Sequence, residues 1–143
     1  MSMQLEIIEA ENYTHLELPF YPDGISCGTP LPHYENIESK LDLNRSLIRN
    51  PLTTFYAKVN GQSMIDDGIE DGDLLVIDRS MEPEDGKIAV CFIGGEFTCK
   101  RIKLKKDGIW LMPANVDYRP IHISEKSEFQ IWGIVTHVIK SLS

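Results

Sequence analysis

The sequence predicts a mainly β domain, barrel-like or sandwich-like, that follows a flexible N-terminal arm. Short runs rich in β-branched and aromatic residues recur from residue 54 onward, and turn residues bound each run. Helical apolar periodicity is almost absent from the chain. Ahead of these runs, residues 19–33 are dense in proline and glycine, which favour an extended or turning backbone.

The N-terminal third contains the one helix that the sequence predicts. Residues 1–18 show only a loose apolar pattern, and residues 19–33 are expected to form an exposed arm. The helix is predicted at residues 44–49, with Asp42 or Asn44 as its N-cap. It should end near Asn50, because Pro51 disfavours helical backbone in the residue before it.

Strands are predicted through the rest of the chain. The clearest hairpin joins residues 87–93 to residues 96–104 through Gly94-Gly95, a pair suited to a two-residue turn. The last run, residues 129–139, is a candidate dimer contact, with a plain core strand as the alternative. The other strands are expected at residues 54–59, 73–78, 108–112 and 121–123.

Composition limits the classes of protein that remain. The 143 residues suit one domain with a tail, and 42% hydrophobic with 25% charged residues is ordinary for a globular protein. No apolar run approaches the roughly 18 residues that span a bilayer, and the N-terminus lacks the features of a secretory signal. We therefore expect no membrane association and a cytoplasmic location.

Cysteine and histidine give little support to metal or redox chemistry. Cys27, Cys91 and Cys99 are odd in number and lack paired spacing, and the four histidines are scattered. Cys91 and Cys99 are expected to be small core residues. The acidic cluster at residues 66–73 lacks the register of a calcium loop and is interpreted as solvated turns. We expect no metal and no cofactor.

Charge argues against direct, sequence-specific DNA binding. The net charge is −8, whereas proteins of that class cluster lysine and arginine against phosphates. Residues 1–27 hold five acidic residues and no lysine or arginine, so this leader is the more acidic part. The basic run Arg101, Lys103, Lys105 and Lys106 is interpreted as a solvated strand face that can touch an acidic partner.

A serine and a lysine carry the main chemical signal. Strand alternation puts Thr98, Lys100, Ile102 and Leu104 on one face, so Lys100 is expected to lose solvation, which lowers its pKa. At a pKa of about 10.4, only roughly one lysine in 2,500 is neutral at pH 7, so a lysine base needs such a shift. The alternatives are a lysine whose ammonium reaches water, and a Ser63 that only caps a turn.

Three motifs together resemble the LexA-type family of self-cleaving peptidases. They are Gly61-Gln62-Ser63-Met64, then Asp71-Gly72-Asp73-Leu74-Leu75-Val76, and then Glu96-Phe97-Thr98-Cys99-Lys100-Arg101. Within that family the chain resembles the UmuD-like branch of SOS mutagenesis proteins, which cut a cysteine-glycine bond such as Cys27-Gly28. The resemblance runs from about Pro19 to the C-terminus and implies the family's β-rich, barrel-like peptidase fold.

The resemblance implies a site and a reaction. Ser63 would be the nucleophile, Lys100 the general base, and Cys27-Gly28 the bond that is cut, although that dipeptide alone reads as an ordinary turn. Cleavage would remove residues 1–27 as an N-terminal arm and leave residues 28–143 as the peptidase and polymerase-subunit domain. A separation of 35 residues between Gly28 and Ser63 permits a chain to cut itself or its partner.

The resemblance also implies partners. A RecA filament on single-stranded DNA would stimulate cleavage, and the trimmed homodimer would join a Y-family, UmuC-like polymerase in translesion synthesis. An acidic leader of 27 residues cannot house a helix-turn-helix domain, so a LexA-like repressor is not expected. The alternatives are a non-catalytic polymerase-binding module with a vestigial serine–lysine pair, and a signal-peptidase-like enzyme, which the absence of a membrane anchor disfavours.

Overall fold

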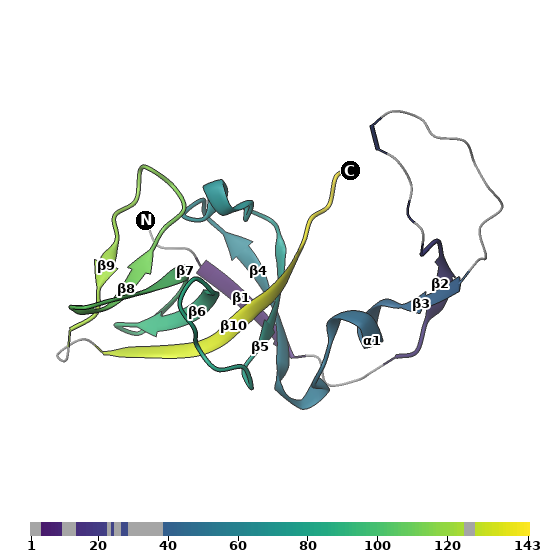
Figure 1. Cartoon of the computed structure of the whole chain (residues 1–143), viewed down its shortest axis with the longest axis horizontal. Coiled ribbons are helices and arrows are strands. Elements are labelled where there is room, and N and C mark those ends of the chain that lie inside the picture. The colour runs from purple at the N-terminus through teal and green to yellow at the C-terminus, as the bar shows by residue number, and fades with distance from the viewer. Residues whose placement is uncertain (1–3, 10–13, 23, 25–26, 29–38, 125–127) are drawn as a thin grey trace. The chain divides into compact units, whose positions relative to one another are not determined.

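The computed structural model describes residues 4–9, 14–22, 24, 27–28, 39–124 and 128–143. The chain forms two compact units, one of Met1–Glu11 with Asn50–Ser143 and one of Asn12–Arg49. Residues 10–13, 23, 25–26 and 29–38, which include most of the predicted arm, lie outside the described residues. The cartoon in Figure 1 shows the elements of each unit.

The larger unit is built on one antiparallel sheet of eight strands. Its strand order is β1-β4-β5-β10-β6-β7-β8-β9. Strand β1 is hydrogen-bonded to β4 and also lies close to β7, so the sheet curls back on itself as a barrel does (Figure 1). The strands are β1 (Gln4–Glu9), β4 (Thr54–Asn60), β5 (Leu74–Asp78), β6 (Ile88–Ile93), β7 (Glu96–Lys105), β8 (Gly108–Met112), β9 (Ile121–His122) and β10 (Phe129–Ile139).

The smaller unit contains a two-stranded ladder and the predicted helix. Strand β2 (Glu17–Phe20) pairs antiparallel with β3 (Ser39–Asp42), and neither strand was predicted. Helix α1 (Leu43–Leu47) begins after Asp42, whose carboxylate accepts a hydrogen bond from the amide of Asn44. Asp42 is therefore the N-cap, which confirms one of the two predicted caps.

Pro51 begins a second helical element. Helix α1 stops at Leu47, before Pro51 as predicted, and Pro51 then opens the 3-10 turn η1 (Pro51–Thr53). Asn50 caps that turn by accepting a hydrogen bond from the amide of Leu52. A proline at the first helical position loses no hydrogen bond, because that amide has no partner within the turn.

All seven strands predicted from residue 54 onward are confirmed. The hairpin β6–β7 turns at Gly94 and Gly95, with φ of 54° and 85°, and glycine adopts such positive values without steric cost. One detail was wrong, because Leu104 is 52% exposed instead of sharing a buried face with Lys100. Beyond Arg101, β7 has lost β6 as a neighbour and pairs with β8 alone, so the core does not reach Leu104.

The hydrophobic core includes one sequence neighbour of each candidate site residue. Met64, beside Ser63 in sequence, and Cys99, beside Lys100, are both fully buried in the same hydrophobic cluster. Cys91 lies in a second cluster, and both thiols act as the small core residues that were predicted. Strand β10 is central, between β5 and β6, so both of its edges are hydrogen-bonded.

Candidate active site

Strand β7 places Lys100 in the interior of the larger unit. Thr98, Lys100 and Ile102 are 5%, 4% and 1% exposed, so this stretch of the face is buried as strand alternation predicts. The intervening Arg101 is half-buried and forms an ion pair with Asp67 at 3.0 Å. The lysine that the pattern singled out thus lies on the buried face, and its arginine neighbour reaches a partner on the other.

A short loop after β4 places Ser63. Gly61, with φ of 103°, turns the chain out of the strand, and its amide donates to the carboxylate of Asp71. The amide of Ala114 donates to the carbonyl of Ser63 at 2.8 Å, and the side chain of Asn115 donates to the carbonyl of Gln62 at 2.7 Å. These bonds hold the loop from both sides, and Ser63 is fully buried.

The loop and the strand bring the two predicted residues together. Lys100 Nζ lies 2.8 Å from Ser63 Oγ, across 37 positions of sequence. The same amine lies 3.2 Å from the carbonyl oxygen of Cys99 and 6.0 Å from the ring centre of Tyr118. A hydroxyl and an amine in direct contact can exchange a proton without movement of the backbone.

Burial sets the protonation of this pair. Desolvation lowers the pKa of the Lys100 ammonium below its ordinary value of 10.5, and charge on Cys99 or Cys91 would oppose that shift. Burial also raises the pKa of both thiols to about 12, so near neutral pH they stay uncharged. The thiols therefore contribute little negative charge to hold the lysine in its ammonium form.

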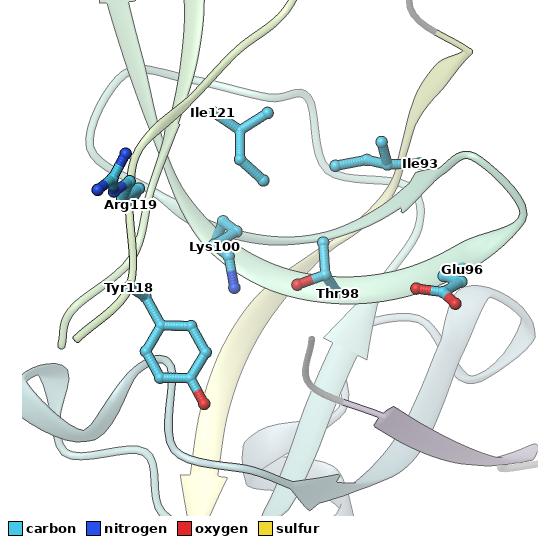
Figure 2. A pocket seen from close by; sticks show the side chains of 7 residues that line it. All are labelled: Ile93, Glu96, Thr98, Lys100, Tyr118, Arg119 and Ile121. Atoms are coloured by element: carbon cyan, nitrogen blue, oxygen red, sulfur yellow. The ribbon is translucent and has the colours of Figure 1, made fainter. Parts of the chain in front are cut away.

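A pocket opens beside the lysine. Its volume is about 260 Å³, and its lining includes both Thr98 and Lys100. Figure 2 shows Glu96, Thr98 and Lys100 in a row along β7, with Tyr118 and Arg119 beyond Lys100. Thr98 Oγ1 is buried and has no hydrogen-bond partner among the described residues. Ile93 and Ile121 complete the lining.

Backbone donors lie next to the serine. Within the described part of the chain, the amides of Ser63 and Met64 donate no hydrogen bond, whereas the neighbouring Ile65 amide donates to the carbonyl of Gln62. Two adjacent free amides at a nucleophile can stabilise a negative oxygen as it forms.

The other predicted site residues lie in the smaller unit. Cys27 and Gly28 are both exposed in a bend, and Cys27 is a free thiol.

Four of the five acidic residues at positions 66–73 are exposed, as solvated turns predict, and Asp73 is buried. Asp67 pairs with Arg101, and Asp73 pairs with Lys140 and accepts a bond from the amide of Glu70. Among the described residues, no group of histidine, cysteine, aspartate or glutamate could hold a metal ion. None of the helices described is long and apolar enough to cross a membrane.

Sequence reasoning missed the segment that completes the site. Ala114 and Asn115 fix the serine loop, and Tyr118 and Arg119 line the pocket, yet all four lie between strands β8 and β9. The only local signal was Pro113 with the turn-forming Asn115, which marks a loop without indicating what the loop contacts.

A mainly β unit with a buried serine–lysine pair beside an open pocket is typical of hydrolases that need no histidine. The chain belongs to the Peptidase S24-like family, whose model matches residues 19–136. This membership and the mainly β fold confirm the predicted resemblance.

The relatives cover most of the chain. Protein MucA of Salmonella typhimurium is 39% identical over 137 residues, which is 94% of this chain and 93% of that protein. Protein ImpA of Shigella flexneri is 36% identical over 122 residues, 85% of this chain and 82% of that protein. The LexA repressor of Thiobacillus denitrificans is 39% identical over 118 residues, 82% of this chain but 58% of the repressor.

Proposed function

We propose that this chain is a serine peptidase that cuts its own Cys27-Gly28 bond, with Ser63 as nucleophile and Lys100 as general base. The observation that carries the proposal is the 2.8 Å contact between two buried atoms, Lys100 Nζ and Ser63 Oγ. Membership of the Peptidase S24-like family supports it. The chain belongs to a peptidase family whether or not Ser63 and Lys100 have these roles.

The first step is acylation. Neutral Lys100 removes the proton from Ser63 Oγ, and the oxygen attacks the carbonyl carbon of Cys27. The carbonyl oxygen becomes negative, and the free amides of Ser63 and Met64 are the donors placed to stabilise it. The carbon–nitrogen bond then breaks, and the Lys100 ammonium gives its proton to the leaving amine of Gly28.

The second step is hydrolysis of the ester that joins Cys27 to Ser63. Neutral again, Lys100 takes a proton from water, and the resulting hydroxide attacks the ester carbonyl. The ester bond breaks, and Ser63 Oγ recovers its proton from the lysine. The products are residues 1–27, ending in a free carboxylate, and residues 28–143, beginning with a free amine.

The resemblance to UmuD-like proteins extends the proposal to a cellular role. The trimmed chain, as a homodimer, acts as an accessory subunit of an error-prone, Y-family translesion polymerase in the SOS response to DNA damage. A RecA filament on single-stranded DNA stimulates the cut. The acidic leader and the net charge of −8 fit a protein that reaches DNA through partners.

One incubation tests the reaction. Purified full-length chain is held at alkaline pH, or at neutral pH with RecA, ATP and single-stranded DNA, and its mass is followed. A fragment that begins at Gly28, absent from matched Ser63→Ala and Lys100→Ala chains, is the expected result. An intact wild-type chain under both conditions would instead indicate a binding module with a vestigial pair.

A further inference from the structure

The first strand of the chain covers an edge of the sheet. Among the strands that the structure describes, β1 pairs antiparallel with β4 alone and stands at the end of the strand order, so β4 would be the edge without it. Strand β1 also lies close to β7, where the curled sheet would otherwise be open. The N-terminal residues are thus part of the sheet of the larger unit, although the bond proposed for cleavage lies in the smaller one.

Cleavage would cut the covalent link that holds β1 in place. This step rests on the proposed function, because Cys27-Gly28 lies between β1 and β4 in the sequence. Among the described residues, residues 1–27 then keep two ladders to the product, β1 with β4 and β2 with β3, and the hydrogen bonds of Thr14 with Asn44 and of His15 with Asp42. The described residues of β2 are all exposed, and a two-stranded ladder of that kind is marginal in water.

Strand β1 would therefore leave on dilution. While the leader is tethered, β1 competes for the edge at an effective concentration in the millimolar range, and after the cut it must bind as a separate peptide. A separate peptide also loses translational and rotational freedom each time it binds. The product keeps β4 but loses the strand that satisfies its outer edge.

The uncovered edge is suited to another strand. Ala57 and Val59 of β4 are fully buried in the main hydrophobic cluster, while Lys58 between them is exposed. An unpaired row of backbone amides and carbonyls is a template for strand addition. Strand β1 occupies this edge in the intact chain, so its sequence indicates which residues a partner strand needs. In the register, Leu5, Glu6 and Ile7 lie opposite Val59, Lys58 and Ala57.

We propose that the edge of β4 is a docking site for an extended segment of a partner protein, and that β1 blocks this site until the leader is removed. The segment adds antiparallel, as β1 does, with apolar residues opposite Val59 and Ala57 and an acidic residue opposite Lys58. Self-cleavage is then the event that exposes the site, which links the peptidase to partner binding through one strand.

The probe is a fluorescein-labelled synthetic peptide of residues 2–11, and its binding is measured by fluorescence anisotropy. The target is the full-length chain before and after cutting. One sample cuts itself, and a second carries Ser63→Ala with the recognition sequence of a site-specific protease in place of residues 22–27. Mass measurement reports the cut separately, so a chain that fails to cut itself counts against the proposed function alone.

We expect the cut chain to bind the peptide roughly 100-fold or more tightly than the uncut chain, whose tethered β1 outcompetes it. The substitution Lys58→Glu changes an exposed residue, and it should weaken binding of the peptide to the cut chain roughly 2- to 10-fold. A peptide that carries Glu6→Lys should restore that binding.

Several outcomes would overturn the docking site. They are equal binding to cut and uncut chains, and a charge reversal without rescue. A cut chain that keeps its leader, or one that pairs its β4 edges in a dimer that excludes the peptide, would also overturn it.

Discussion

Removing the Lys100 ammonium should change how the stability of this protein depends on pH. The perturbation is Lys100→Met, which keeps the length of the side chain and replaces a buried amine with an apolar group. Both chains to be compared carry Ser63→Ala, so neither is cut and neither leaves a serine hydroxyl without its partner. The free energy of unfolding is then measured for each.

The sign follows from the lowered pKa of Lys100 in the folded state. Between that pKa and the ordinary 10.5, the unfolded chain binds more protons than the folded one, so stability rises with pH across this window. The slope for one group is at most about 1.4 kcal/mol per pH unit. At pH values below this window, the folded lysine chain bears the full free-energy cost of burying the ammonium. The methionine chain should therefore be the more stable one there.

The two buried thiols act in the opposite direction. Burial raises the pKa of Cys91 and Cys99 from 9.0 to about 12, so above pH 9 the unfolded chain loses protons that the folded chain keeps. Stability therefore falls with rising pH through these groups. Both chains contain both cysteines, and this contribution cancels in the difference apart from the direct effect of Lys100 on each thiol.

Urea unfolding at pH 7, 8, 9 and 10, followed by tryptophan fluorescence, measures that difference. As pH rises, the free energy of unfolding of the lysine chain should increase relative to that of the methionine chain, by up to about 1.4 kcal/mol per pH unit. Parallel curves over the whole range would refute the reasoning, because they would mean that Lys100 keeps its ordinary pKa in the fold.

Three further substitutions test two residues near the pair and the helix cap of the smaller unit. Asn115→Ala removes the bond to the Gln62 carbonyl, and it should cost about 0.5–1.5 kcal/mol of stability. It should also slow cleavage by about 10- to 100-fold, since Ser63 loses its support; a cleavage rate equal to that of the wild type would contradict this. Thr98→Val removes a buried hydroxyl that lacks a partner, and urea unfolding should show a gain of about 1 kcal/mol. Asp42→Ala removes the cap of α1, and hydrogen exchange should show local loss of about 0.5–2 kcal/mol, which Asp42→Asn largely avoids.

The sequence alone predicted the parts of the site whose signals are local. Alternation along one strand was enough to put Lys100 on a buried face, and the turn glycines at 94 and 95 defined its hairpin. Alternation does not show where the core ends, however, and Leu104 lies beyond the last residue that β6 covers. A face was predictable, but its extent was not.

The missed elements depend on pairing between distant residues. Strand β1 contains Glu6 and Glu9 and consecutive isoleucines, which breaks a regular alternation, and its partner β4 begins 45 residues after β1 ends. The pocket segment around Tyr118 and Arg119 has no period at all. Elements of this kind are defined by tertiary contacts, which local propensity does not contain.

The rate of cleavage as a function of pH tests the central claim most directly. Intact mass is followed for the wild-type chain and for Ser63→Ala from pH 7 to 10.5. We predict one fragment that begins at Gly28, formed by the wild type alone, with a rate that rises with pH by at most about tenfold per unit and levels off below pH 10.5. A rate that is still rising tenfold per unit at pH 10.5, or a Ser63→Ala chain that yields the same fragment, would contradict a neutral Lys100 acting on Ser63.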